Sequence, residues 1–509
     1  MSMDASKASK RSSELGFVLS LAAFLVNGIL CWYRESRLHR MILAFARFSK
    51  RLFFGSRILE FIRRKESATR VLTESRAGRM LTGSFRGLAG CACRMGKPLQ
   101  FSLAGRLAHA AVKEFSVVLG LYVLLQTAIP HQFWYNGVSL GLALVVLSLY
   151  LFKCGMEKDQ ELDPLRLDTA LLLFMLTGAL CAVTSLVLRD SVRIYVLNLI
   201  PIAIVLVMVN ALRSSRDFRI FTGFLLTGTV IASLYGFFQY AMGIEVDETL
   251  VDTLVSGSIR RLFSTMGNPN NYAEYLLLCL PFFAASFLNA KTVRTKLLVG
   301  FLALLPLGNL YLTSSRSSWL GLVVAACVFL FITERRLLPV LLLAGAGLVP
   351  LLPASILQRL GTIGRDSSST YRLKIWDGSL RLLRDYWLTG IGQGPAPFMA
   401  LFPNYSTLRG VVHSHMLPLQ IWIETGISGF LAFVWMMGRL VKKTLAHAFS
   451  GADRERTVLM AAALSGLAGL IFTGSFEYVW FYPRVMGMFW IVTGFLMALL
   501  GGDRKHAAN

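Results

Sequence analysis

The segment Ile220–Gly243 reads IFTGFLLTGTVIASLYGFFQYAMG, which is 24 residues without one charged side chain. A bilayer core is about 30 Å thick and needs about 20 apolar residues in a helix, so this stretch predicts a transmembrane helix. Similar runs recur on both sides of it, and each is expected to be helical because lipid offers the backbone no other hydrogen-bonding partner. They lie at 115–130, 138–153, 167–188, 194–212, 271–290, 297–313, 319–333, 337–353, 416–438, 457–475 and 485–501.

We therefore predict an all-α polytopic membrane protein with about 12 transmembrane helices, or 13 if the apolar segment 15–33 also crosses. Hydrophobic residues make up 55% of the chain, charged residues only 16%, and the mean hydropathy is +0.58. An average soluble domain has about 25% charged residues. The composition thus excludes a soluble enzyme with one water-facing surface.

The net charge of +24 is concentrated near the N-terminus, where residues 34–113 hold 18 Lys and Arg against 4 Asp and Glu. No nucleic-acid-binding motif accompanies these residues, so we expect no nucleic-acid partner. Near a membrane surface each basic residue contributes about 1 kcal/mol of attraction to anionic lipids. The partner predicted for 34–113 is therefore anionic membrane lipid.

The distribution of basic connections orients the predicted helices. Short basic connections at 213–219, 291–296, 334–336, 439–443 and 503–505 all fall on the side of the basic 34–113 region, which is the cytoplasmic side. The connections predicted for the outer side are 131–137, 189–193, 244–270, 314–318, 354–415 and 476–484.

The resulting organisation has six parts. They are an N-terminal tail and apolar segment at 1–33, a basic cytoplasmic or interfacial region at 34–114, membrane helices at 115–353, a large extracytoplasmic loop at 354–415, membrane helices at 416–501 and a cytoplasmic tail at 502–509. None of the seven cysteines falls in an outer loop, and their spacing fits neither a disulfide framework nor a zinc site.

Two outer connections combine arginine with polar turn residues. Arg260–Asn271 contains Gly-Asn-Pro-Asn, a turn signature in which Asn270 or Asn271 can cap the next helix, and Glu274 follows one turn later. A carboxylate inside a membrane segment is a functional candidate, although pairing with a nearby arginine is an equal alternative. Thr313–Trp319 forms a polar island around Arg316, whose outer position runs against the positive-inside preference and favours function over simple snorkelling.

The large loop 354–415 is predicted to contain an amphipathic helix that lies at the membrane surface or caps a cavity. Its apolar stripe comprises Leu373, Trp376, Leu380, Leu383 and Trp387, and Arg372, Arg381 and Arg384 lie off the stripe. For Arg381 and Arg384 a solvated basic face is the preferred interpretation. The glycines of Gly390–Pro395 are only a weak signal for a phosphate cradle, because no strand precedes them.

Two of the seven histidines, His413 and His415, stand at the mouth of the following span. Their spacing does not place both on one helical face, so no zinc pair is implied. A neutral imidazole there can act as a general base, and a pair of interfacial histidines is the structural alternative. Arginines on the same side suit bidentate binding of phosphate oxygens and would replace a metal in neutralising a diphosphate leaving group.

Together these residues resemble the O-antigen ligase and polymerase family of bacterial membrane proteins. The matching elements, between about residues 220 and 440, are Arg261 with Gly267-Asn268-Pro269-Asn270, Ser315-Arg316 with Trp319, Tyr371-Arg372 and Trp376 ahead of Gly390-Ile391-Gly392, and His415, Leu419-Gln420 and Glu424-Thr425-Gly426.

The resemblance implies a multi-pass protein of the bacterial inner membrane, with its active site facing the periplasm or exterior. It also implies a large outer loop between the ninth and tenth spans, which is where 354–415 falls. The implied activity is transfer of a glycan from an undecaprenyl-diphosphate carrier to an acceptor hydroxyl on a glycan or lipid, with no metal and no cofactor.

By that likeness Arg261, Arg316 and Arg372 bind the diphosphate, His415 is the base, and Asn268, Asn270, Glu274 and Glu424 support them. Two positions depart from the family pattern, because Met416 stands where an asparagine is usual and Pro418 replaces a common aromatic or aliphatic residue. These departures leave His413 as an alternative base, while the spacing of nine positions from Glu424 favours His415. Two competing functions are a transporter or flippase of lipid-linked sugars and a cell-wall polymerase of the shape-and-division type.

Overall fold

The computed structural model describes residues 102–244, 260–348 and 367–501, apart from Lys158, Asp159, Glu161 and Ala452, together with parts of 75–90. The segment 15–33, most of the basic region 34–114, and residues 354–366 of the large loop lie outside this described part. The chain divides into two units, residues 1–71 with 334–354, and residues 72–333 with 355–509. Of the first unit, the structure describes the short helices η5 (Arg335–Leu337) and α15 (Leu338–Leu348).

The second unit is built from helices, and its described residues contain no strand. Its long helices are α6 (Leu103–Lys113), α7 (Phe115–Ala128), α8 (Asn136–Met156), α9 (Thr169–Val183), α10 (Leu188–Ala211), α11 (Ser215–Met242), α12 (Pro269–Asn289), α13 (Val293–Leu312), α14 (Arg316–Thr333), α17 (Ser367–Tyr386), α19 (Leu417–Phe449), α20 (Arg454–Thr473) and α21 (Pro483–Gly501). Short helices η1 (His131–Phe133), η2 (Pro164–Arg166), η4 (Ser264–Met266), α18 (Pro395–Leu401) and η7 (Phe402–Asn404) lie in the connections.

Each of the twelve predicted apolar runs contains a helix, so the prediction of an all-helical fold is confirmed. Within the described residues, nine helices are long and apolar enough to span a membrane, and the bent pair α6–α7, with a 76° bend, brings the number to ten if it counts as one span. Helices α9 and α15 are apolar but shorter than these. The total of twelve spans therefore stays a prediction.

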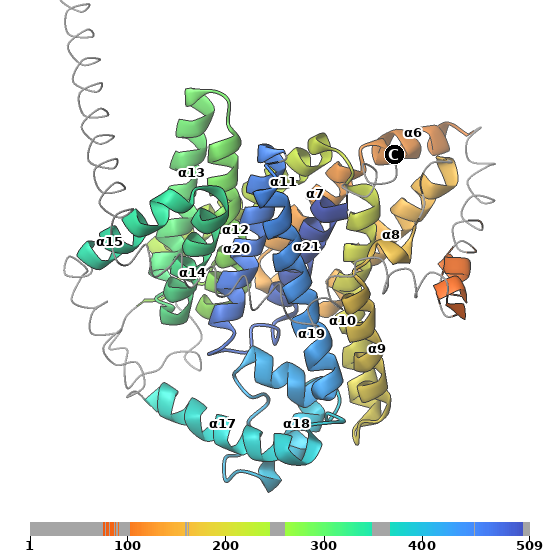
Figure 1. Cartoon of the computed structure of the whole chain (residues 1–509), viewed down its shortest axis with the longest axis vertical. Helices are drawn as coiled ribbons and strands as arrows, with labels where there is room; N and C mark the ends of the chain where they lie inside the picture. The colour runs from red at the N-terminus through yellow and green to blue at the C-terminus, as the bar shows by residue number, and fades with distance from the viewer. Residues whose placement is uncertain are drawn as a thin grey trace, which may run out of the picture. The chain divides into compact units, whose positions relative to one another are not determined.

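Helices α12, α20 and α21 form the interior of the second unit, because 78%, 72% and 89% of their most apolar windows are buried. Helices α14 and α20 pack side by side (Figure 1). At their crossing Gly321 and Gly469 face each other so closely that a Cβ on either would lie within 3.0 Å of the other's carbonyl oxygen. Small residues at such crossings let helix backbones approach, which is how apolar helices associate in lipid.

The connections predicted for one side of the membrane contact one another. At the predicted outer end, Ser185 bonds the carbonyl of Ile391, and Arg484 bonds the carbonyls of Ile129 and Thr265. At the predicted inner end, Arg219 pairs with Glu455, and Arg216 pairs with Glu114. Each of these contacts joins residues predicted for the same side of the membrane, and the assignment of the two sides stays a prediction.

Two predicted connections are corrected. Residues 439–443 lie inside the 33-residue helix α19, where the side chains of Arg439 and Lys443 bind the buried carboxylate of Asp168 at 2.9 and 2.7 Å. An internal ion pair thus explains a charge cluster that resembles a loop in the sequence. Residues 189–193 similarly belong to the first turns of α10, which starts at Leu188, so the outer connection there is shorter than predicted.

The loop helix predicted in 354–415 is α17, but its predicted stripe does not face the protein core. Leu383 is buried, whereas Leu373, Leu380 and Trp387 are 53%, 53% and 49% exposed. A different face of α17, carrying Ile375, Ser379 and Leu382, packs against the rest of the loop and α19. Arg381 and Arg384 are exposed, in agreement with the solvated basic face.

Candidate active site

The centre of the site is a contact between His415 and Glu477. The Nδ1 atom of His415 lies 2.8 Å from Oε1 of Glu477, and both side chains are partly accessible, at 26% and 18%. His415 precedes α19, and Glu477 lies between α20 and α21, so two connections from the same end of the bundle form the contact. Because an ionised carboxylate only accepts hydrogen bonds, Nδ1 of His415 carries a proton, and in a neutral ring Nε2 is then the accepting nitrogen.

Arg372 completes this group from α17. Its Nη2 donates to Oε2 of Glu477 at 2.9 Å. Burial by itself raises the pKa of Glu477, but the hydrogen bond with His415 and the charge of Arg372 outweigh it and lower the pKa to about 2. Glu477 is therefore an anion at neutral pH, held between a cation and an imidazole.

His413 lies beside this group but in a different environment. It is 6% exposed, its ring centre is 4.2 Å from that of His415, and its Nδ1 accepts the backbone N–H of His415 at 3.2 Å. Burial, together with the charges of His415 and Arg372, lowers the pKa of His413 to about 4. The accepting nitrogen is thus already occupied, and the ring is neutral and largely shielded from solvent.

Three non-glycine residues of the described chain have positive φ, and each lies in one of the arginine or histidine motifs. They are Ser264 (49°), Ser314 (55°) and His415 (51°). A left-handed conformation is costly for an L-residue and persists only where the surroundings enforce it, often at functional sites. The backbone thus marks the same three motifs that the sequence pattern singled out.

Arg261 connects two of these motifs. Its Nε donates to the carbonyl of Thr313 at 2.9 Å and its Nη2 to Oδ1 of Asn270 at 2.7 Å. The predicted cap is corrected, because it is Asn268 that accepts the backbone N–H groups of Asn270 and Asn271 and starts α12. Asn270 is thereby left to bind Arg261 with its side chain.

Glu274 lies one turn further along α12 and is 1% exposed. Its carboxyl interacts electrostatically with Glu477 and Arg372, and within the described part of the chain its Oε2 has no hydrogen-bond partner. Glu274 therefore lies between the turn at Asn270 and the group formed by His415, Glu477 and Arg372. An unsatisfied buried carboxyl oxygen is costly and marks a place where a further polar group can bind.

Arg316 is the first residue of α14 and is half-buried. The carbonyl of the next residue, Ser317, accepts a hydrogen bond from Thr473 at 3.2 Å, four residues before Glu477. Leu417, which starts α19, donates its N–H to the carbonyl of Gly474. These backbone contacts place the start of α14 at the same end of the bundle as His415 and Glu477.

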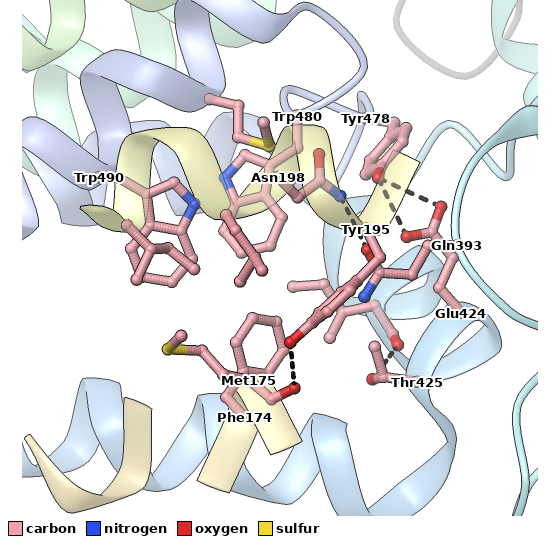
Figure 2. A pocket seen from close by; sticks show the side chains of 14 residues that line it. Phe174, Met175, Tyr195, Asn198, Gln393, Glu424, Thr425, Tyr478, Trp480 and Trp490 are labelled. Atoms are coloured by element: carbon pink, nitrogen blue, oxygen red, sulfur yellow. Dashed lines mark hydrogen bonds between the residues drawn. The ribbon is translucent and has the colours of Figure 1, made fainter. Parts of the chain in front are cut away.

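Glu424 takes part in a separate buried network. Its Oε1 accepts from Gln420 at 2.9 Å, and its carboxylate faces the hydroxyl of Tyr478 at 3.3 and 3.4 Å (Figure 2). Gln420 in turn accepts the backbone N–H of Ser414, which lies between the two histidines. Glu424 therefore fixes the backbone of the histidine motif instead of touching His415 itself.

The glycines at 390–394 serve close packing and form no phosphate cradle. The N–H of Ile391 bonds the carbonyl of Ile423, and the N–H of Gln393 bonds Oγ of Ser191. Gly390, Gly392 and Gly394 all have positive φ, and a Cβ on any of them would collide with α19, α10 or the connection before α10. The segment is thus a buried link between helices.

A cavity of about 330 Å³ opens next to this network. Glu424, Tyr478 and Phe481 line one wall, and the ring of His413 lies behind it, 4.6 Å from that of Phe481. Gln126, Ser139 and Asn198 are among the polar groups of the other walls. A smaller space of about 30 Å³ adjoins it, where Asn198 bonds Gln393 beside Trp480 and Trp490 (Figure 2).

His413, His415 and Glu477 are also the one group within the described residues whose ligand atoms lie close enough to hold a metal ion, within 4.8 Å of one another. Two of the three side chains already take part in other contacts. Nδ1 of His415 bonds Oε1 of Glu477, and Oε2 of the same carboxylate accepts from Arg372. The arginine cation next to Glu477 opposes the binding of a second cation there.

Two residues of the site were not singled out from the sequence. Glu477 lies in the predicted outer connection 476–484, and the signal that could have found it is a carboxylate between two strongly apolar spans. Arg484 is 8% exposed and bonds the carbonyls of Gln126, Thr265 and Ile129. Arg484 thereby connects the end of α7 to the turn after Arg261. The signal that could have found it is the one used for Arg316, an arginine on the predicted outer side against the positive-inside preference.

A comparison with known families matches residues 301–434 to the family described as O-antigen ligase. The matched stretch includes Arg316, Arg372, His413, His415 and Glu424, and it leaves out Arg261, Glu274 and Glu477. No curated protein matches the chain.

Proposed function

Because residues 301–434 carry an O-antigen ligase domain, we propose that the chain is a membrane glycosyltransferase, a ligase or a polymerase, that uses a glycan linked to an undecaprenyl-diphosphate carrier. The glycan is transferred to a hydroxyl of a glycan or lipid acceptor on the extracytoplasmic face of the bacterial inner membrane. The carrier, the face and the residue roles go beyond the family match. They are supported by the site geometry and by the charge pattern of the connections.

The observation that carries this proposal is the orientation of His415 by Glu477. A carboxylate on Nδ1 fixes the tautomer and the ring, and it stabilises the imidazolium that forms when Nε2 takes a proton. His413 has its Nδ1 occupied by the backbone N–H of His415 and is buried. His415 is therefore the proposed general base, and His413 supports its position.

The proposed step is a direct displacement at the anomeric carbon of the donor glycan. Nε2 of His415 accepts the proton of the acceptor hydroxyl while the hydroxyl oxygen forms a bond to that carbon. The bond between the anomeric carbon and the diphosphate oxygen breaks, and its electron pair leaves with undecaprenyl diphosphate. Arg261, Arg316 and Arg372 are proposed to bind the diphosphate and stabilise its growing charge, so the step needs no metal.

Supporting roles follow from the contacts of the remaining residues. Asn268 starts α12 and thereby presents Asn270, which holds Arg261. Glu274 places a buried carboxyl group next to Arg372 and Glu477. Glu424 holds Gln420, which binds the backbone between the two histidines.

The test is transfer in vitro by the full-length protein in lipid vesicles, with an undecaprenyl-diphosphate glycan as donor. We expect transfer in the presence of a chelator, loss of transfer in Arg316→Ala, and near wild-type transfer in Arg381→Ala. Arg381 is the matched control because its side chain is 59% exposed and pairs with Asp377 one turn away on the same exposed face. Equal activity of both variants, together with full loss on chelation, would contradict the mechanism and would favour His413, His415 and Glu477 as metal ligands. Movement of the donor across the vesicle membrane without transfer would instead support a transporter.

A further inference from the structure

Helix α17 has three faces, and the described residues of the chain cover only one of them. The covered face carries Ile375, Leu382 and Leu383, which form an apolar cluster with Phe398 and Phe402. A second face, the apolar stripe of α17, carries Leu373, Leu380 and Trp387, and each of these is about half exposed. The third face carries Lys374, Asp377, Arg381, Arg384 and Asp385, all exposed. Large apolar side chains repeated every seven residues beside a charged face form an amphipathic surface that the described part of the chain leaves uncovered.

The position of α17 along the helix bundle indicates which kind of molecule can cover the apolar stripe. Its C-terminal end is attached to α19, because the carbonyl of Trp387 accepts both Nε1 of Trp422 at 2.9 Å and the backbone N–H of Ile427 at 2.9 Å. Figure 1 shows α17 running across the direction of α19 instead of along it. The stripe is thus held at one fixed height on a membrane-spanning helix.

That height matches a membrane–water interface. Helix α19 is interrupted at Gly426, and its straight part from Ile427 to Phe449 is about 35 Å long, which matches the bilayer core of about 30 Å. This straight part begins at Ile427, whose N–H bonds the carbonyl of Trp387, so the end of α17 lies at the outer end of the span. Tryptophan is enriched at this level, and Trp422 is the residue that binds the end of α17.

The charges of the third face suit the same location. Asp377 pairs with Arg381 at 2.8 Å, and Asp385 accepts the hydroxyl of Tyr405 at 2.6 Å. The three cations Lys374, Arg381 and Arg384 outnumber the two carboxylates, so the face carries a net charge of +1. Helices that lie in the headgroup region combine apolar side chains with Lys and Arg in this way.

We infer that α17 lies on the outer leaflet of the bilayer, with Leu373, Leu380 and Trp387 inserted among the lipids and the basic face directed at anionic headgroups. The occupant of the stripe is phospholipid, and neither a second copy of the chain nor the polyprenyl tail of a donor is required. The inference is independent of the proposed transfer reaction.

The test places the photoreactive residue benzoylphenylalanine at Leu380 of the full-length protein, in nanodiscs of phosphatidylethanolamine and phosphatidylglycerol without any glycan donor. Matched variants carry it at Lys374, on the charged face of the same helix, and at Leu382, which is fully buried. After illumination, the adducts are identified by mass spectrometry.

We expect phospholipid adducts from Leu380 at about ten times the yield from Lys374, and adducts from Leu382 only within the protein, because apolar burial decides depth in the interface. Replacing phosphatidylglycerol by a neutral lipid should lower the yield at Leu380. Absence of lipid adducts at Leu380 would overturn the inference. Capture of a second copy of the chain alone, or lipid capture only after a polyprenyl donor is added, would overturn it as well.

Discussion

At the scale of single residues, Glu477 decides how His415 works, since it holds Nδ1 at 2.8 Å. Glu477→Gln keeps the size of the side chain but removes the charge that stabilises the imidazolium. We expect transfer to fall by about 100-fold or more, because losing such an orienting carboxylate costs at least this much in enzymes with a comparable histidine. The measurement is the initial rate of transfer at saturating donor, with Asp377→Asn on the exposed face of α17 as the control. A wild-type rate in Glu477→Gln would remove the carboxylate from the mechanism.

His413 predicts how stability depends on pH. In the unfolded chain its imidazole takes up a proton near pH 6.5, whereas in the folded chain burial, with the charges of His415 and Arg372, lowers the pKa to about 4 even though Glu477 partly opposes this. Protonation therefore favours the unfolded chain, and wild type loses up to about 3 kcal/mol as the pH falls from 6.5 to 4. His413→Gln should lose less over the same range, as measured by thermal unfolding in detergent. Parallel curves for the two proteins would show that His413 titrates normally.

At the scale of elements, the Glu424-Thr425-Gly426 motif is explained by a kink in α19. Gly426 has φ 64° and ψ −177°, and a Cβ there would collide with the carbonyl oxygen of Leu388. We expect Gly426→Ala to lower the free energy of unfolding by about 2 kcal/mol or more, from the left-handed backbone and the loss of close packing with the end of α17. Gly438→Ala in the same helix is the matched control, because nothing lies within 4 Å of a Cβ there. Equal melting temperatures of the two variants would contradict this role for Gly426.

The elements also show where sequence reasoning reached its limit. Runs such as 220–243 predict their helices directly, because lipid leaves the backbone no alternative. The burial of Gly390–Gly394 could not be predicted, since it depends on Ser185 and Ser191, some 200 positions away. For α17 the periodicity grouped Leu373, Leu380 and Trp387, which are exposed, with Trp376 and Leu383, which belong to the packed cluster. A helix with two apolar faces does not reveal from sequence which one packs against protein.

At the scale of the whole molecule, a buried ion cluster connects α9 to α19 near the predicted inner end. The side chain of Asp168 is 2% exposed and binds both Arg439 and Lys443. Asp168→Asn leaves the Arg439 cation buried without its counter-ion, and we expect a loss of about 3 kcal/mol in unfolding free energy. Asp377→Asn removes an exposed ion pair and should cost less than about 1 kcal/mol. A loss as small as that in Asp168→Asn, measured by unfolding in detergent, would contradict this cluster as a stabilising contact.

The charge pattern predicts which connections share a side of the membrane, because positive residues sort connections by side whatever the packing of the helices. It could not predict that Glu477 meets His415 and Arg372, since that contact joins positions 62 and 105 residues apart. Arginine and histidine motifs are recognisable one by one. Their partner carboxylate is identified only once α20 and α21 bring the connection 474–482 against the start of α19.

His415 is the proposed base, and the most direct test of this role compares the transfer rates of His415→Gln and His413→Gln with an undecaprenyl-diphosphate glycan as donor. Both variants keep a polar side chain of similar size, so we expect both to fold. Equal elution from a sizing column checks this. We predict that His415→Gln loses transfer by about 100-fold or more and that His413→Gln keeps most of it, since general base catalysis contributes about 10² to 10⁴ in rate. Transfer retained in His415→Gln and lost in His413→Gln would contradict the assignment and move the base to His413.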